Sequence, residues 1–540
     1  MRIRGPYALR SRKLKQRLQT AFGKVPDVHY FAGDMDYIRA YYDFRQENGL
    51  DPFLLDDITW NDLNMDQVFK RINQKRCTSG EQYLYYMLRT PALDAEDYER
   101  RRALIQFAQS DPQRRLKLEL ILARLGCRRR ADLCRAFYPS AHGIGKLLFY
   151  LALFLFFVCS VAAALLRPHF GALCLLLSIT LNLYLHEFRK RRSQDDFDTV
   201  NYGVSMIFAM RRLRALHDAE LDAHLRPAYE SLDRLQSVIR TGGVTAAANN
   251  GGLEDVVLSI TLLDLITYEF LKNKLGRCRD DVLTIHEHLG RLDAAISVAS
   301  YRASVDSYVE PALRFDAKAP AAIHAAALIH PLLSDPVAND LITERSILIT
   351  GSNASGKSTY LKTAALAAIM AQSICTVLAQ SYAANAFRVL TSMALNDDLL
   401  AGESYYIVET RSLKRILDAS KAPSPLLCVV DEVLRGTNTV ERIAASSEVL
   451  QALSDGGTIC LAATHDIELC ELLSGSFRMF HFEEQVGRES MQFDYRVREG
   501  KATTRNAINL LRLLGFDEQI VQNAHACADR YLECGSWSLR

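Results

Sequence analysis

Residues 351–359 read GSNASGKST and fit the pattern G-x-x-x-x-G-K-[ST]. The run SILIT at 346–350 has the composition of a buried strand, and a helical pattern begins near Lys357. In this strand–loop–helix setting, N–H groups of the loop and of the helix N-terminus surround phosphate groups. The stretch therefore predicts an α/β domain with a nucleotide-binding loop. Its candidate contacts are Gly351, Ser352, Asn353, Ala354, Ser355, Gly356, Lys357, Ser358 and Thr359.

Four residues of this loop have separate predicted roles. Gly351 and Gly356 allow the tight turn. Lys357 is expected to reach the β- and γ-phosphates of ATP, and the Ser358 hydroxyl is expected to ligate Mg²⁺.

Two further apolar runs end in chemically active residues. The first, LLCVVDE at 426–432, ends in Asp431, the second candidate ligand of Mg²⁺, and Glu432, the candidate to polarise the attacking water. The second, TICLAAT at 458–464, is followed by His465, which is expected to contact the γ-phosphate or its water. A histidine at a strand end is often incidental, but the order loop, Asp–Glu, His favours the functional interpretation.

The pattern of predicted secondary structure changes at about residue 325. After it, short β-rich runs alternate with helical patterns, which predicts a mostly parallel sheet. Before it, residues 51–140 and 210–305 mix apolar and charged residues at helical spacing, and the second region has the pattern of long, charged helices that could act as levers.

An apolar block interrupts this helical region. Residues 147–166 carry no charge, and the shorter run 170–186 is softened by Ser178, Thr180 and Asn182. About 20 helical residues cross the ~30 Å core of a bilayer. Arginines at 128–130 and basic residues at 189–192 flank the block, so a hairpin with both outer ends in the cytoplasm is expected. The alternative is a helix pair buried in a soluble core.

The N-terminal end is strongly basic, although the net charge of the whole chain is only +2. Residues 1–24 contain eight Lys and Arg and no acid, so they could contact nucleic acid or anionic lipid, or form a solvated terminus. The twelve cysteines include no C-x-x-C pair, which argues against a zinc site and fits free thiols in a reducing cytosol.

Four stretches resemble, in order and spacing, the ATPase domain of the MutS family of DNA mismatch repair proteins. They are LITGSNASGKSTYLKTAALAAIMAQ, DDLLAGESYYIVET, VVDEVLRGTNTVERIAAS and AATHD, and the resemblance covers about residues 325–525. A weaker resemblance to the helical core and lever of the family covers residues 78–94 and 289–313.

The resemblance implies a homodimeric ABC-type ATPase with ATP and Mg²⁺ bound between two subunits. Ser404 matches the serine that reaches the γ-phosphate on the partner subunit, and Asn353 matches the asparagine of the loop. Residues 435–439 match the segment at the dimer seam, and 506–524 match the helical part that braces the dimer. The candidate catalytic residues are then Glu432, His465, Lys357 and Asn353.

The sequence also departs from the family. The loop of the family normally has Pro, Met and Gly where this chain has Ser352, Ala354 and Ser355. Near the adenine the family often places an aromatic residue before an aliphatic one. Here the stretch reads Asp335-Pro336-Val337, which leaves Val337 as the candidate contact. Only about 50 residues precede the helical core, so the mismatch-reading domain is not expected, and the DNA-clamp insertion is expected to be absent or trimmed.

The fold class expected from the sequence is a C-terminal α/β ABC-type P-loop ATPase domain after an all-α core and lever with a transmembrane hairpin. The expected segments are a basic arm (1–50), a helical core (51–146), the hairpin (147–186), a lever region (187–325), the ATPase domain (326–505) and a C-terminal brace (506–540).

The expected function is ATP-dependent DNA binding without direct mismatch readout, at the cytoplasmic membrane, with the soluble domains in the cytoplasm and residues 147–186 in lipid. One alternative is a membrane-associated mechanical ATPase that acts on a substrate other than DNA. Another is a nucleotide-sensing scaffold with slow hydrolysis, against which the pair Asp431-Glu432 argues.

Overall fold

The computed structural model describes residues 6–128, 132–136, 143–192, 194–236, 253–352, 355–393, 405–486, 491–501, 508, 511–512 and 515–534. Contacts divide the chain into two compact units. The helical unit comprises residues 1–52, 69–87 and 102–304, and the sheet unit comprises residues 53–68, 88–101 and 305–540. The helical region before residue 305 and the α/β alternation after it are confirmed.

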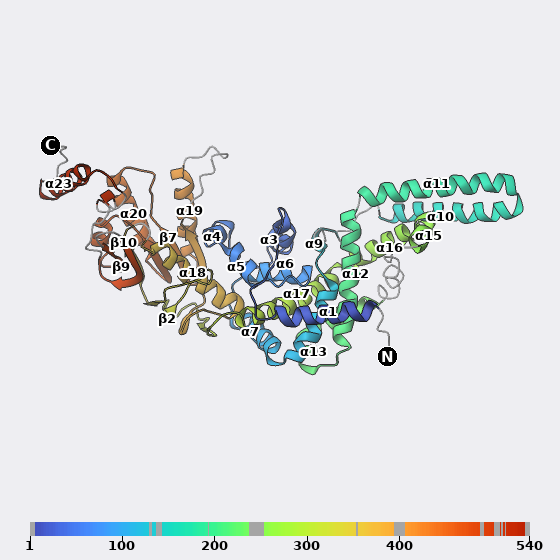
Figure 1. Cartoon of the computed structure of the whole chain (residues 1–540), viewed down its shortest axis with the longest axis horizontal. Coiled ribbons are helices and arrows are strands. Elements are labelled where there is room, and N and C mark those ends of the chain that lie inside the picture. Colours follow the sequence, from blue (N-terminus) through green and yellow to red (C-terminus); the bar gives the residue numbers. More distant parts are fainter. Residues whose placement is uncertain are drawn as a thin grey trace. The chain divides into compact units, whose positions relative to one another are not determined.

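The helical unit is built from helices of very different lengths (Figure 1). Its helices are α1 (Pro6–Ala21), α2 (Asp34–Ile38), α3 (Ala40–Glu47), α8 (Pro112–Leu125), α9 (Leu133–Ala136), α10 (Gly143–Leu166), α11 (Pro168–Arg192), α12 (Gln194–Arg214), α13 (Ala219–Arg234), α15 (Leu253–Thr261), α16 (Leu263–Arg277) and α17 (Arg279–Arg302). Three more helices, α5 (Met65–Ile72), α6 (Thr78–Arg89) and α7 (Ala95–Ser110), contribute to both units.

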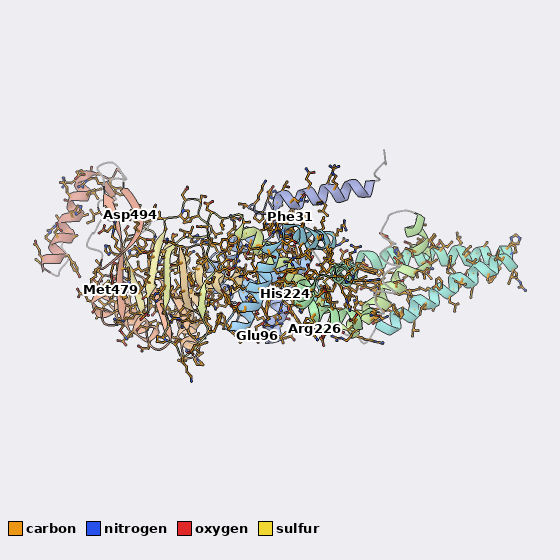
Figure 2. The ribbon with its side chains drawn as sticks, turned by 90° about the horizontal axis from the view of Figure 1, so that it is seen from below. Phe31, Glu96, His224, Arg226, Met479 and Asp494 are labelled. Carbon is orange, nitrogen blue, oxygen red and sulfur yellow. The ribbon has the colours of Figure 1, made fainter. Side chains whose placement is uncertain are left out.

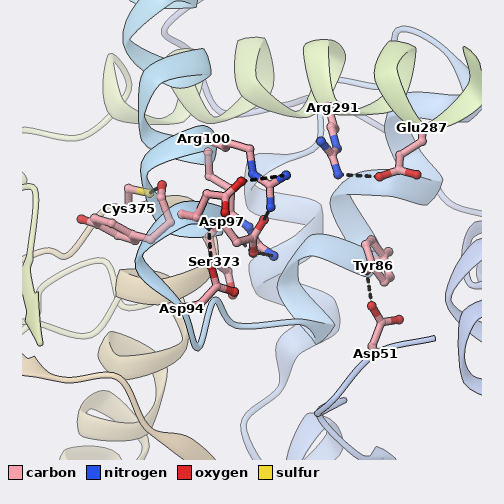
Figure 3. Close-up of polar contacts among 12 residues, drawn as sticks. Asp51, Tyr86, Asp94, Asp97, Arg100, Glu287, Arg291, Ser373 and Cys375 are labelled. Atoms are coloured by element: carbon pink, nitrogen blue, oxygen red, sulfur yellow. Dashed lines mark hydrogen bonds and ion pairs between the residues drawn. The ribbon is translucent and has the colours of Figure 1, made fainter. Parts of the chain in front are cut away.

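The centre of the helical unit is the close packing of α6 on α17. A Cβ at Gly80 would lie 1.9 Å from the Asp293 carboxylate, so only glycine lets the two helices approach this closely. Nearby, the buried Arg76 guanidinium binds Glu119 at 3.0 Å and Asp293 at 3.1 Å. Figure 3 shows two further polar contacts of this unit, Tyr86 donating to Asp51 at 2.7 Å and Arg291 paired with Glu287.

Helices α10 and α11 form a long antiparallel pair, with α15 and α16 packed beside it (Figure 1). Residues 145–166 and 168–189 are long and apolar enough to cross a membrane. In an 18-residue apolar window of each stretch, only 11% and 17% of the window is buried. Two polar residues of α11 contact the neighbouring helices: the Asn182 amide donates to the Ile260 carbonyl at 2.8 Å, and His186 lies 2.6 Å from Asp264.

The sheet unit contains two sheets. The larger has the order β10-β9-β4-β8-β7-β6, and all neighbouring strands in it are parallel except the β9–β10 hairpin. Its strands are β4 (Ser346–Thr350), β6 (Arg388–Ser392), β7 (Leu426–Asp431), β8 (Thr458–Ala463), β9 (Phe477–Val486) and β10 (Met491–Glu499). The smaller has the order β1-β5-β2-β3, with β1 (Ala312–Arg314), β2 (Ile323–Leu328), β3 (Asn339–Thr343) and β5 (Ser381–Asn385).

Helix α18 (Lys357–Ile374) contacts strands of both sheets and is buried almost all round, as its alanine-rich apolar sequence requires. A separate apolar core joins β4, β7 and β8 to α19 (Tyr405–Ser420), α20 (Thr439–Leu453) and α21 (Glu468–Leu472). Helix α23 (Glu518–Cys534) follows the large sheet.

Short segments from the front of the chain complete the sheet unit. Helix α4 (Asp57–Asp62) packs on β6, where the buried Asp62 carboxylate accepts from the Thr391 hydroxyl at 2.6 Å and from the Met393 N–H at 3.0 Å. At the start of α7, Asp94 accepts from the Asp97 N–H at 2.8 Å (Figure 3).

Candidate nucleotide site

The candidate site lies where three neighbouring parallel strands end. The glycine-rich loop follows β4, His465 follows β8, Asp431 ends β7 and Glu432 comes directly after it. The order β4-β8-β7 brings these ends together, because carboxyl ends of parallel strands share one edge of a sheet. Two backbone bonds continue the ladder into the site: Thr464 donates to Ile349 at 3.0 Å, and Glu432 donates to Ala463 at 2.9 Å.

The loop has the backbone that its glycines predict. Gly351 has φ 145° and Gly356 has φ 108°, a region that side chains other than glycine rarely adopt. The buried Lys357 ammonium donates to the carbonyls of Gly351 and Ser352, both at 2.7 Å. Lys357 thus closes the loop on itself and can exchange these carbonyls for phosphate oxygens, which are stronger acceptors for a cation.

The remaining loop residues are placed as follows. The Ser355 hydroxyl donates to the Ser352 carbonyl at 2.9 Å, while Ser358 and Thr359 are exposed in the first turn of α18. Asn353, Ala354 and Ser404 lie outside the described residues, so their predicted roles stay predictions.

Glu432 is the centre of a charged cluster. Its carboxylate lies 2.9 Å from Nε2 of His465, which in turn lies 3.4 Å from the Lys357 ammonium, and it also pairs with Arg435. Burial raises the pKa of Glu432, but the hydrogen bond with His465 and the charge of Arg435 outweigh burial, and its pKa lies below the usual value. Glu432 is therefore ionised at neutral pH and can accept a hydrogen bond from a water molecule.

The backbone around Glu432 is strained. Glu432 has φ 55° and Leu434 has φ 57°, both in the left-handed region. The buried Glu409 of α19 holds this turn by accepting from the Leu434 N–H at 2.5 Å. Such strain persists only where surrounding contacts enforce it, and it is common at functional sites.

Asp431 meets the requirement for a cation ligand. Its carboxylate is 8% exposed, and its Oδ1 has no hydrogen-bond partner among the described residues. An unpaired buried carboxylate oxygen is costly unless a cation or water satisfies it. Mg²⁺ is bound by one or two protein oxygens together with substrate phosphates and waters, so Asp431 and the Ser358 hydroxyl fit it.

A pocket of about 150 Å³ adjoins the loop. Val337, the predicted contact near the adenine, is among its lining residues, and the lining also includes two aromatic residues that the sequence did not predict, Phe482 of β9 and Tyr495 of β10. A Cβ at Gly356 would lie 3.2 Å from the Tyr495 ring, so this glycine also keeps the pocket open. The full lining is Leu328, His330, Leu333, Asp335, Pro336, Val337, Asn339, Gly356, Thr359, Tyr360, Thr363, Phe482 and Tyr495.

Polar contacts hold Tyr495 over this pocket. Tyr495 has φ 53° at an irregularity of the β9–β10 register. The Asn339 amide donates to the Tyr495 carbonyl at 2.9 Å and its oxygen accepts from the Val497 N–H at 2.9 Å, which ties β10 to β3. Burial lowers the pKa of His330 to about 4, so this lining residue is neutral at pH 7. An aromatic ring, an aliphatic side chain and a neutral imidazole suit a planar base.

The fold and the site define an α/β domain that carries a phosphate-type loop and two acids at the carboxyl ends of its parallel strands, after a helical region. Residues 347–531 match the family described as MutS domain V. This domain therefore relates the C-terminal part of the chain to the MutS family.

Individual relatives agree with the family match. The chain is 29% identical over 293 residues to "DNA mismatch repair protein MutS 2" of Halobacterium salinarum. This alignment covers 51% of this chain and 33% of the relative. It is 32% identical over 285 residues to "DNA mismatch repair protein MutS" of Natronomonas pharaonis (50% and 32%) and 31% identical over 282 residues to that of Thermosipho melanesiensis (50% and 33%). The matched part spans about a third of each of these relatives.

Proposed function

We propose that this chain is a Mg²⁺-dependent ATPase of the MutS type that binds DNA. The observation that carries the proposal is the convergence of Lys357, His465 and Glu432, linked by contacts of 3.4 and 2.9 Å at the end of the glycine-rich loop. Phosphoryl transfer to water uses a cation that binds phosphate and a group that orients the attacking water, and Lys357 and Glu432 are such groups. The His465 imidazole links the two.

Each residue has a separate task in this proposal. Lys357 leaves its two loop carbonyls to bind the β- and γ-phosphates. Glu432 accepts a hydrogen bond from the attacking water and orients it, and His465 contacts the γ-phosphate while it fixes the Glu432 carboxylate. Asp431 and Ser358 would hold Mg²⁺, which would neutralise charge that develops on the phosphates. The nucleobase would lie in the pocket that Tyr495 and Val337 line.

Dimerisation and membrane attachment are part of the proposal. The family resemblance supports two subunits that close on ATP, with Ser404 reaching the partner's nucleotide. The two long helices 145–166 and 168–189, with little of their apolar surface buried, support an anchor in lipid. The basic flanks support soluble parts in the cytoplasm. ATP-driven motion would then act on DNA held near the membrane, without direct mismatch readout.

A second candidate function has its own observation. The exposed apolar faces of α10 and α11 suit an engine whose work is on a membrane component rather than on DNA. Measuring ATP hydrolysis with duplex, branched and mismatched DNA separates the two. Stimulation that disappears at higher salt supports DNA, and no binding to any of these DNAs at low salt contradicts it.

The nucleotide part has its own test. Lys357→Ala should abolish binding of a fluorescent ATP analogue, whereas the matched variant Lys414→Ala, at an exposed lysine of α19 paired with Asp418, should bind normally. Equal binding by both variants contradicts the assigned loop. Membrane fractionation of the full chain tests the anchor, and recovery in the soluble fraction contradicts it.

A further inference from the structure

The N-terminal helix α1 has a cationic surface that the nucleotide site does not use. Arg12, Lys13, Lys15 and Arg17 are all exposed. Within the part of the chain that the structure describes, none of the four forms an ion pair, and residues 1–24 contain no acid. Four uncompensated cations on one helix create a local field that attracts a polyanion.

The other side of α1 is already packed inside the helical unit. Leu14, Leu18 and Phe22 are half-buried, α1 contacts α8, and the Arg115 guanidinium lies 3.5 Å from the Phe22 ring centroid. Residues 12–22 are therefore docked on the unit along one side and present their charged side to solvent.

The end of α1 is fixed as well. Gly23, at φ 73°, donates its N–H to the Ser300 hydroxyl at 3.0 Å. A Cβ there would meet Ala303 of the α17 end at 3.4 Å, so this close approach favours glycine. A fixed helix presents its cations in a defined array, which costs less ordering on binding than a mobile tail.

A basic helix can bind either an anionic lipid surface or a nucleic acid, and the packing of α1 favours one of the two. A helix that lies in a lipid interface inserts an apolar face among the acyl chains. In residues 12–22, whose side chains the structure describes, the apolar residues Leu14, Leu18 and Phe22 are half-buried against the protein, which leaves little apolar surface there for lipid.

We infer that the exposed cations of α1 bind the phosphate backbone of duplex DNA. Arginine and lysine bind phosphates without reading sequence, so this surface positions DNA on the helical unit and does not discriminate bases. The inference rests on the proposed function, because it names where that function holds its DNA.

The experiment uses the full chain in a neutral detergent and a fluorescent duplex DNA of random sequence, with Kd measured by anisotropy over a series of salt concentrations. The test variant is Lys13→Gln/Lys15→Gln/Arg17→Gln. Glutamine has nearly the helix propensity of lysine and arginine, so α1 should remain folded. The control Arg226→Gln/Lys414→Gln/Lys421→Gln removes the same charge from exposed cations that have acidic partners. Arg226 lies on α13 (Figure 2).

The test variant should weaken DNA binding roughly tenfold or more at low salt and flatten the slope of log Kd against log salt by about 2 to 3. The control should match the unmodified chain, and all three proteins should hydrolyse ATP equally without DNA. An unchanged slope in the test variant overturns the inference while leaving DNA binding itself in place. If the unmodified chain binds no DNA, the DNA part of the proposed function fails with it. Binding of the same proteins to phosphatidylglycerol and phosphatidylcholine vesicles tests the lipid alternative. If the test variant keeps the salt slope of DNA binding but loses a preference for phosphatidylglycerol vesicles, α1 binds lipid instead of DNA.

Discussion

Nε2 of His465 lies 2.9 Å from the Glu432 carboxylate, although the two residues end different strands of the large sheet. This contact links the acidic end of β7 to the end of β8 and, through Lys357, to the loop after β4. It also lowers the pKa of Glu432, so the state of one residue depends on the other.

The first prediction concerns this dependence. His465→Ala removes a contact that lowers the pKa of Glu432, so that pKa should rise toward its usual value. Because Glu432 acts as a carboxylate, the acidic limb of the ATPase pH profile should move to higher pH. At neutral pH Glu432 stays ionised, but the variant also lacks the proposed contact of His465 with the γ-phosphate, so turnover there should fall about 10²-fold. Asp466→Asn is the matched control, since Asp466 pairs with Arg442 instead. An acidic limb that does not move in His465→Ala would show that the contact is incidental.

The second prediction concerns the nucleobase pocket. Tyr495→Ala removes the aromatic face beside Gly356 and should raise the Kd for ATP about tenfold, since stacking on a base contributes ~1–3 kcal/mol. Tyr495→Phe keeps the ring and should bind like the unmodified chain. Equal affinities of the Ala and Phe variants for a fluorescent ATP analogue would place the base elsewhere.

The third prediction concerns α4, which contributes to the sheet unit from the front of the chain. Asp62→Ala leaves the Thr391 hydroxyl and the Met393 N–H without their acceptor. Each lost partner of a buried donor costs ~1–3 kcal/mol, so the melting temperature of the sheet unit should fall by several degrees. Asn61→Ala, at the exposed neighbouring position, should melt normally. Similar melting of the two variants would contradict this packing.

The fourth prediction concerns acid stability. Burial lowers the pKa of His286 in α17 to about 4, and neither ring nitrogen has a hydrogen-bond partner among the described residues. The unfolded chain binds a proton at this histidine near pH 6.5, before the folded chain does. The contribution of the neutral His286 to the free energy of unfolding is therefore complete above pH ~6.5, and it is lost as the pH falls toward 4.

His286→Phe keeps the ring and removes the titration, so helical circular dichroism should persist to lower pH in this variant. His217→Phe, at an exposed histidine, is the control. If both variants lose their helical signal at the same pH as the unmodified chain, His286 does not limit acid stability.

Local patterns in the sequence were sufficient to predict the strands and the helix that carry the glycine-rich loop and the two acids. The predicted strand at 346–350 is β4, the predicted strand before Asp431 is β7, and α18 begins at Lys357. These elements combine short apolar runs with glycine at positive φ, signals that operate within a few residues.

Contacts between segments that are distant in the sequence could not be predicted from such local patterns. Tyr495 reaches the pocket through an irregular register in the β9–β10 hairpin and an amide bridge from Asn339, 156 residues earlier. Similarly, α4 and its Asp62 lie within the region predicted as helical core, and only tertiary packing assigns them to the sheet unit. The sequence did contain one signal for the pocket, the alternating aromatic residues of FHFEEQV (480–486) and MQFDYRV (491–497). This pattern indicates a β-hairpin, but it does not indicate which part of the protein the hairpin contacts.

The most direct test of the central claim is single-turnover ATP hydrolysis by the full chain with Mg²⁺, compared between the unmodified protein and Glu432→Gln. Glutamine keeps the size of the side chain and removes the charge that orients water, so nucleotide affinity should be kept and hydrolysis should fall about 10²-fold or more. Hydrolysis by Glu432→Gln at the rate of the unmodified chain, or no hydrolysis by either protein, would contradict the account.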